Sequence, residues 1–199
     1  MALIKLNNRS IKDVTSLPFG VGNLIHIQSQ TASNSASISF TTGINSTYKE
    51  YQFYFINVAP RTDRVRFEFN LSTNSGSNYN VTKTTTAFRS QHGEGGSFPS
   101  VSYSDLQDLA QSTSFQSIGC EDLSNDSDHA GGGYLSLFNP SSTTYVKHFI
   151  SVFQMTQSDD YSMNGFVGGY GNTTSAINAV RFQMSSGNFD GTIALFGVV

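Results

Sequence analysis

Charged side chains are scarce in this sequence. Lys, Arg, Asp and Glu make up 13% of its 199 residues, and the formal net charge is -3. The eleven basic residues are scattered, apart from a small cluster at Arg61, Arg64 and Arg66. Binding to nucleic acid needs a concentrated basic surface, so we expect no nucleic acid partner. Arg64 and Arg66 alternate with Val65 and Phe67, which predicts the solvent side of a strand and not a phosphate site.

Cysteine and long apolar runs are also nearly absent. Cys120 is the only cysteine, which excludes a disulfide within the chain and suits folding in a reducing cytoplasm. No run approaches the roughly 20 apolar residues that a membrane-spanning helix requires, and the first residues, MALIKLNNRS, lack the apolar region of a secretion signal. We therefore expect neither membrane insertion nor export by a standard signal.

Residues that could support catalysis or hold a cofactor form no recognised motif. The four histidines include no pair at the spacing of zinc ligands, and the glycine-rich segments lack the lysine and the helix of a phosphate-binding loop. His92 and Glu94 could act as a base and its orienting carboxylate, but no nucleophile motif accompanies them. We therefore expect a non-enzymatic protein without a cofactor. His26 and His148 fall in strand patterns that predict half-buried or core imidazoles.

Serine, threonine and asparagine are abundant and together account for 64 residues. With so little charge, the surface has to be solvated mainly by hydroxyl and amide groups. Such a surface suits permanent assembly, because few charges are desolvated when subunits meet. It is equally typical of any β protein that is rich in threonine and serine.

Apolar and polar residues alternate with a period of two along most of the chain, and the helical period is nearly absent. The pattern predicts about ten strands, at 24–28, 36–40, 50–58, 64–72, 81–88, 133–138, 145–154, 165–170, 179–185 and 192–196. We expect an all-β fold, an antiparallel β-sandwich of jelly-roll type with at most one short helix. Residues 1–22 are expected to form an N-terminal arm, and residues 23–199 a single β-sandwich domain.

Two segments carry more specific expectations about structure. Residues 51–58 are apolar on both faces, which predicts a central strand or one at a subunit contact. In residues 102–111, a serine cap precedes Leu106, Leu109 and Ala110, which would share one face of a short helix.

One acidic loop is the best candidate for a metal site. Its oxygen ligands are Glu121, Asp122, Asn125, Asp126 and Asp128. Hard oxygen ligands close in sequence can gather a calcium ion. The loop departs from the usual calcium pattern at Ala130 and Leu137, where ligands are needed, so we expect a solvated loop and no metal site, with calcium binding as the alternative.

A second candidate site lies between Asp159 and Asn172. Tyr161, Phe166 and Tyr170 occur there among polar turn residues, and Asp159 offers a carboxylate. Aromatic faces combined with amide and carboxylate acceptors can bind a sugar ring. The alternative is a hairpin whose aromatic side chains pack beneath it.

The N-terminal arm carries a short apolar patch, Leu3, Ile4 and Leu6, next to the basic residue Arg9. No strong turn links this patch to the sandwich, so we expect it to be buried against a sister subunit or another protein. The alternative is an ordered first strand of the same sandwich.

Several segments carry a resemblance to a known family. They are LIKLNNRSIKDVTSLP, SQTASNSASISFTTGINSTYKEYQFYFINV, NVTKTTTAFRSQHGEGGS, FNPSSTTYVKHFIS and AVRFQMSSGNFDGTIALFGV. Over nearly its whole length the chain resembles a family of virion proteins encoded by tailed bacteriophages, especially those of aquatic bacteria. The resemblance implies a capsid decoration, a tail-fibre or spike domain, or a host-receptor binder. The family has no motif tied to catalysis.

The resemblance also implies a location and partners. We expect a structural protein that is synthesised and assembled in the host cytoplasm and resides in the virion. Its expected partners are other virion proteins and copies of itself in a symmetric oligomer, with a trimer favoured. The alternative function is a carbohydrate- or receptor-binding module at a fibre or spike tip, which would contact a host surface polysaccharide or receptor.

Overall fold

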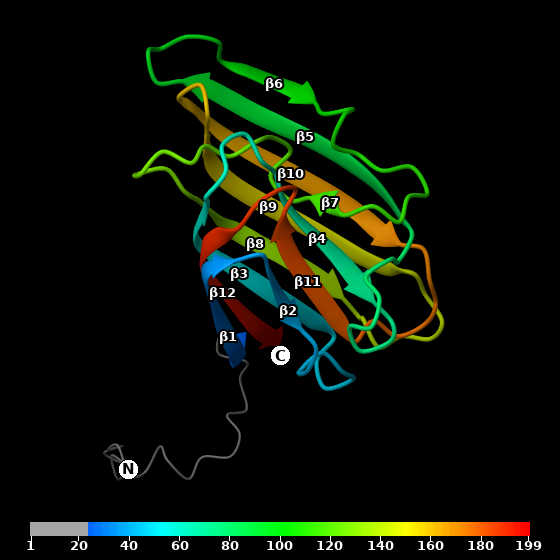
Figure 1. Ribbon diagram of the computed structural model, residues 1–199. Helices are drawn as coiled ribbons and strands as arrows, with labels where there is room; N and C mark the ends of the chain where they lie inside the picture. Colours follow the sequence, from blue (N-terminus) through cyan, green and yellow to red (C-terminus); the bar gives the residue numbers. More distant parts are fainter. Residues whose placement is uncertain (1–23) are drawn as a thin grey trace, which may run out of the picture.

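The computed structural model describes residues 24–199, which form twelve strands and no helix (Figure 1). The strands are β1 (Leu24–Ser35), β2 (Ser37–Phe40), β3 (Glu50–Pro60), β4 (Phe67–Ser72), β5 (Lys83–Gly93), β6 (Ser100–Tyr103), β7 (Gln116–Ser117), β8 (Gly131–Phe138), β9 (Lys147–Gln157), β10 (Tyr161–Gly171), β11 (Ala179–Met184) and β12 (Phe189–Val198). The all-β fold expected from the alternation is confirmed. No helix of these residues is long and apolar enough to cross a membrane.

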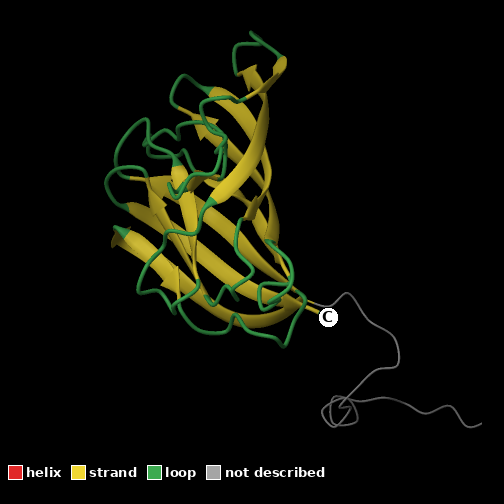
Figure 2. Ribbon diagram, turned by 90° about the vertical axis from the view of Figure 1, so that its right-hand side faces the viewer, coloured by secondary structure: helices red, strands yellow, loops and turns green. Residues whose placement is uncertain are grey.

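Two antiparallel sheets pack face to face, as the two views show (Figures 1 and 2). The larger sheet has the order β1-β12-β3-β8-β9-β10-β5-β6, and the smaller has the order β2-β11-β4-β7. In β4, Phe67, Phe69 and Leu71 are fully buried, whereas Glu68 points to the other side and is half-buried. Period-two alternation thus places one apolar side of each sheet against the other.

The strands are nested in both sheets. β1 pairs with β12 and β2 pairs with β11, while further along the chain β3 pairs with β8 and β4 pairs with β7. Two additions interrupt this order: β5 and β6 lie between β4 and β7 in sequence, and β9 and β10 lie between β8 and β11. All four added strands extend the larger sheet beyond β8, so it is twice as wide as the smaller one in strand number.

Phenylalanine dominates the core between the sheets. Phe182 of β11 is fully buried, and its ring contacts those of Phe53 and Phe55 edge to face, at centroid distances of 5.1 and 5.3 Å. It also lies near Phe40 and Phe67, at 6.1 and 6.0 Å. Such edge-to-face contacts add to the free energy of apolar burial. The C-terminal run of the sequence therefore supplies the centre of the core.

Strand β3 occupies the central position that its two apolar faces predict. It pairs with β12 on one side and β8 on the other. A bulge at Asn57, whose φ is 50°, shifts the register after Phe55. Ile56 lies on the same outward side as Tyr54 and is 51% exposed, whereas the bulge turns Val58 to the core, where it is fully buried.

The helix expected at residues 102–111 is not present. The segment continues as edge strand β6 and then as turns, and Leu106 is 88% exposed. Its backbone bonds to β5 instead: the Ser104 amide donates to the Ala87 carbonyl, and the Thr85 amide donates to the Leu109 carbonyl. Pairing with an open sheet edge thus satisfies more of the backbone than one isolated turn of helix could.

Candidate functional site

The side of the larger sheet that faces away from the smaller sheet, here called the outer face, carries a continuous apolar row. The register aligns one residue from each of seven neighbouring strands: Ala194, Tyr54, Tyr134, Val152, Phe166, Phe88 and Tyr103. Phe88 and Tyr103 remain 47% and 54% exposed. Ala194 is buried and the other four residues are half-buried, so the exposed part of the row lies at its β5–β6 end. Exposed apolar side chains that are grouped in this way are typical of an interaction site.

The outer face is also poor in charge. Strands β5, β6, β8, β9 and β10 contain only three Lys, Arg, Asp or Glu residues, Lys83, Arg89 and Lys147. Lys83 and Lys147 are fully buried on the opposite side, and Arg89, which follows outward-facing Phe88, pairs with Glu121. The outer face of these strands is therefore left to aromatic, aliphatic, hydroxyl and amide side chains.

The part of the outer face that lies on β12 and β3 is almost purely apolar. Leu24, Tyr54, Ile56, Ala194 and Phe196 line a shallow groove of about 290 Å³, which we call the β12–β3 groove. The Phe196 ring lies edge to face against Tyr54, with centroids 5.5 Å apart. Leu24 is 41% exposed, at the beginning of edge strand β1. This groove offers a partner apolar surface with very few polar groups to desolvate.

The second part centres on two stacked rings. Phe88 of β5 and Phe166 of β10 are paired in register, with centroids 4.8 Å apart and planes 8° from parallel. The rings are stacked, so one face of each is covered by the other, and we call this pair the Phe88–Phe166 platform.

Two hollows flank the platform along the strands. The Gly168 hollow, of about 350 Å³, has a mainly apolar lining with a few hydroxyl groups: Thr84, Thr85, Thr86, Phe138, His148, Phe149, Ile150, Gly168, Gly169 and Tyr170. The Asn164 hollow, of about 190 Å³, is lined by Ser90, Gln91, His92, Gln154, Ser162 and Asn164. Asn164 Oδ1 is buried and has no hydrogen-bond partner among the described residues.

The four residues predicted to form a sugar site are not brought together. Phe166 and Tyr170 lie on the outer face, four residues apart on β10. Tyr161 packs against the core, with its ring 6.2 Å from that of Phe98. Asp159 lies in the β9–β10 turn, where its carboxylate accepts a hydrogen bond from Arg64 at 2.6 Å. Phe88, which sequence reasoning did not single out, completes the aromatic surface instead.

The acidic loop disperses its carboxylates. Glu121 pairs with Arg89, and Asp122 lies 3.6 Å from Arg66. Asp126 is the nearest of them to a histidine, His129. Oxygen ligands committed to different partners do not converge as a calcium site requires, so the geometry of these residues gives no support to the calcium alternative.

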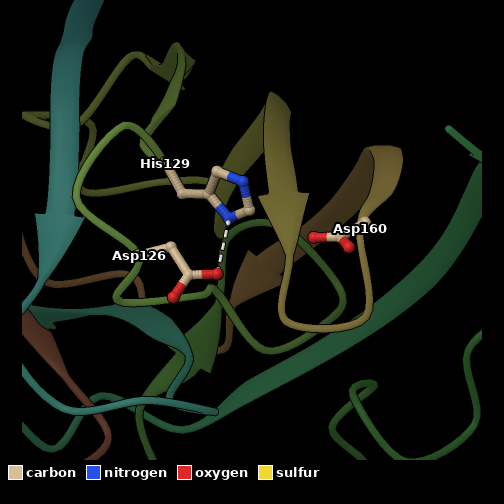
Figure 3. Close-up of side chains that lie close together, drawn as sticks. All are labelled: Asp126, His129 and Asp160. Atoms are coloured by element: carbon tan, nitrogen blue, oxygen red, sulfur yellow. Dashed lines mark ion pairs between the residues drawn. The ribbon is translucent and has the colours of Figure 1, made fainter.

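A different trio does converge, as Figure 3 shows. One potential ligand atom each from Asp126, His129 and Asp160 lies within 4.8 Å of the other two. Asp126 approaches His129 Nδ1 at 3.7 Å, and the β9–β10 turn brings Asp160 in with a φ of 59°. The two aspartates are exposed, and His129 is half-buried between them.

The single thiol is poorly suited to nucleophilic chemistry. Cys120 is fully buried, and burial raises the pKa of its thiol to about 11. The thiol therefore stays protonated at neutral pH, in which form it is a weak nucleophile.

Two further expectations concern the histidines His26 and His148 and the N-terminal arm. The prediction that His26 and His148 are half-buried is wrong, because both are exposed on the outer face. His26 contacts Phe196 edge to face, at 5.3 Å, and His148 lies 6.0 Å from the Tyr170 ring. The contact residues expected in the arm, Leu3, Ile4, Leu6 and Arg9, lie outside the described residues.

Comparison of the chain with protein-family models, with curated proteins and with solved structures finds no match.

Proposed function

We propose that this chain is a non-enzymatic structural protein of a bacteriophage virion, a capsid decoration or a tail or fibre component, that assembles into a symmetric oligomer. The β12–β3 groove carries the proposal. It presents Leu24, Ile56 and Phe196 together on the outer face, with few polar groups among them. The resemblance of the sequence to phage virion proteins supplies the biological setting.

The nested strand order supports a jelly-roll form of the sandwich. Pairing of the first strand with the last, and of the second with the last but one, is what results when a long hairpin folds over on itself. We infer that β5–β6 and β9–β10 are insertions into this scheme. By widening one sheet they separate the β12–β3 groove from the Phe88–Phe166 platform by strands β8 and β9.

Closed symmetry gives the groove a definite occupant, a surface of a neighbouring copy, which in a trimer is a different surface from the groove itself. A ring of identical subunits buries the same patch in every member, and no apolar patch is then left to recruit further copies. Burial of one large aliphatic or aromatic side chain contributes about 1.5–3 kcal/mol before ordering costs. Several such residues per subunit are enough for a stable contact, and a trimer is the expected assembly.

Native mass spectrometry of the purified full chain tests the assembly. We expect a trimer mass for the unaltered protein and a predominantly monomeric mass for Ile56→Lys, because an unpaired charge in the apolar contact costs about 3 kcal/mol or more. Leu106→Lys is the matched control. Leu106 is equally aliphatic and 88% exposed in a loop, so its substitution should leave the trimer intact. Retention of the β-type circular dichroism spectrum shows that Ile56→Lys still folds.

Mass spectrometry of purified phage particles tests the location. The chain should be present, with a copy number comparable to that of the major capsid protein for a decoration and far lower for a fibre component. A chain that is monomeric at every concentration and absent from particles contradicts the proposal.

A further inference from the structure

The geometry points to a binding site for an uncharged carbohydrate chain on the Phe88–Phe166 platform and its two flanking hollows. The site differs from the one that the sequence predicts, because it excludes Tyr161 and Asp159 and includes Phe88, His148 and Asn164. It is independent of the β12–β3 groove, so it stands whether or not the chain forms an oligomer.

The platform offers a pyranose ring an aromatic side chain to pack against. The C–H groups on one face of a sugar ring pack against flat aromatic surfaces, and apolar burial together with the ring quadrupole favours this contact. Because the two rings stack on each other, the surface left for a sugar is mainly that of Phe88, which is 47% exposed, beside the half-buried Phe166. Because both rings are already fixed, little side-chain entropy is lost when a ligand is bound.

The hollows supply the polar groups that a sugar needs at its edge. The Gly168 hollow contains the hydroxyl groups of Thr84, Thr86 and Tyr170 and the imidazole of His148. The Asn164 hollow contains the amides of Gln154 and Asn164. Asn164 Oδ1 has no partner within the described residues, so a sugar hydroxyl could donate to it.

The spacing of the aromatic residues suits a chain of sugars and not a single ring. Phe166 and Tyr170 are four residues apart on β10, which corresponds to about 13 Å along a strand. Gly168 lies between them and has no side chain. The space above its backbone is open, since a Cβ atom added there would have no other atom within 4 Å. The ligand therefore lies along β10, over an aromatic surface at each end and a hollow in the middle.

The lack of charged side chains in the two hollows indicates which class of carbohydrate can bind. No Lys, Arg, Asp or Glu lines either hollow. An acidic polysaccharide would find no cation to offset the desolvation of its carboxylates, whereas neutral hydroxyl groups match the hydroxyl and amide lining. The expected ligand is thus a neutral hexose polymer.

Affinity electrophoresis of the full chain tests the site, with dextran, mannan, galactan or alginate cast into native gels. We expect at least one of the three neutral polysaccharides to retard the protein, and alginate to leave its mobility unchanged. Phe88→Ala and Gly168→Val should each weaken binding about tenfold or more, the first by removing half of the platform and the second by filling the hollow. Gly95→Val is the matched control, since Gly95 is equally unobstructed but lies in the β5–β6 turn.

Three results would overturn the inference. The first is the absence of retardation by all three neutral polysaccharides, or retardation by alginate alone. The second is undiminished binding by both Phe88→Ala and Gly168→Val. The third is a change in the oligomeric state of Gly168→Val, measured by native mass spectrometry, which would mean that this part of the outer face meets a second copy of the chain. Melting curves that match the unaltered protein confirm that the variants are folded.

Discussion

Lys83 is a cation buried without a counter-charge. Its side chain is fully buried, and Nζ donates to Asn70 Oδ1 at 2.6 Å and to the Val81 carbonyl at 2.9 Å. Residues 24–199 provide it with no carboxylate within ion-pair distance. Burial therefore lowers the pKa of Lys83 to about 7, and a large share of the side chain is neutral at physiological pH.

This pKa predicts a stability that rises with pH. Between pH 7 and the ordinary lysine pKa near 10.5, the unfolded chain binds a proton that the folded chain does not. The free energy of unfolding should then increase by up to about 1.4 kcal/mol per pH unit, starting near pH 7. Thermal melting from pH 6.5 to 8.5 measures the effect. This window ends below the range in which the raised pKa of Cys120 would act in the opposite direction.

Substitution isolates the contribution of Lys83. Lys83→Met should remove at least half of the rise in melting temperature over this window, because Met cannot be protonated. Lys49→Met, at an exposed position, should keep the full rise. Equal pH profiles for the two variants would contradict the assignment to Lys83.

Single residues also show the limits of the sequence-based site. Phe166 and Tyr170 share the side of β10 that faces away from the core. The partner of Phe166 is Phe88, 78 positions earlier in the chain, and only the register of β10 with β5 brings the two rings together. That register depends on pairing across the whole sheet, which no local pattern contains. His26 and His148 fail for a related reason, since alternation does not say which side of a sheet is covered.

Among the elements, β3 shows how one residue redirects a strand. Ile56 faces outward like Gln52 and Tyr54, and in a regular strand Val58 would do the same, but the bulge at Asn57 turns Val58 inward. Asn57 adopts a φ of 50°, a left-handed conformation that asparagine tolerates and β-branched residues do not.

We expect the effect of a substitution at Asn57 on stability to depend on how well the new residue tolerates the left-handed conformation. Asn57→Gly should leave stability nearly unchanged, whereas Asn57→Val should lower the free energy of unfolding by about 1–2 kcal/mol. Urea denaturation measures both variants. If the two have the same midpoint and slope, the left-handed conformation does not limit the stability of β3.

The sequence predicts ten of the twelve described strands from their alternating residues. It misses β6 and β7, which are four and two residues long. Two residues are too few to show a period of two, and β6 runs into a segment whose serine cap and leucines favour a helix. The extension of β1 to Ser35 is missed for another reason. Its residues are mostly small and polar, typical of a turn, yet their backbone groups pair with β12 on the sheet edge.

At the scale of the whole molecule, the wide sheet separates two kinds of surface. The smaller sheet covers one side, and the opposite side remains an open face with an apolar groove at one end and an aromatic platform with polar hollows at the other. Scarcity of charge is visible in the composition, but the concentration of uncharged residues on one face is a result of the fold. A narrow sandwich without β9, β10, β5 and β6 would have the groove alone.

The N-terminal segment provides the last test of the proposed assembly. Residues 24–199 bury a continuous core between their own two sheets, and β1 begins at Leu24 beside the β12–β3 groove. Deletion of residues 2–16 should therefore leave the β-type spectrum and the melting temperature nearly unchanged but abolish incorporation into phage particles. Ser substitutions at Leu3, Ile4 and Leu6 in the full-length chain should reproduce this loss, because apolar burial at the contact is what they remove. A truncated chain that unfolds would instead identify the segment as part of the core.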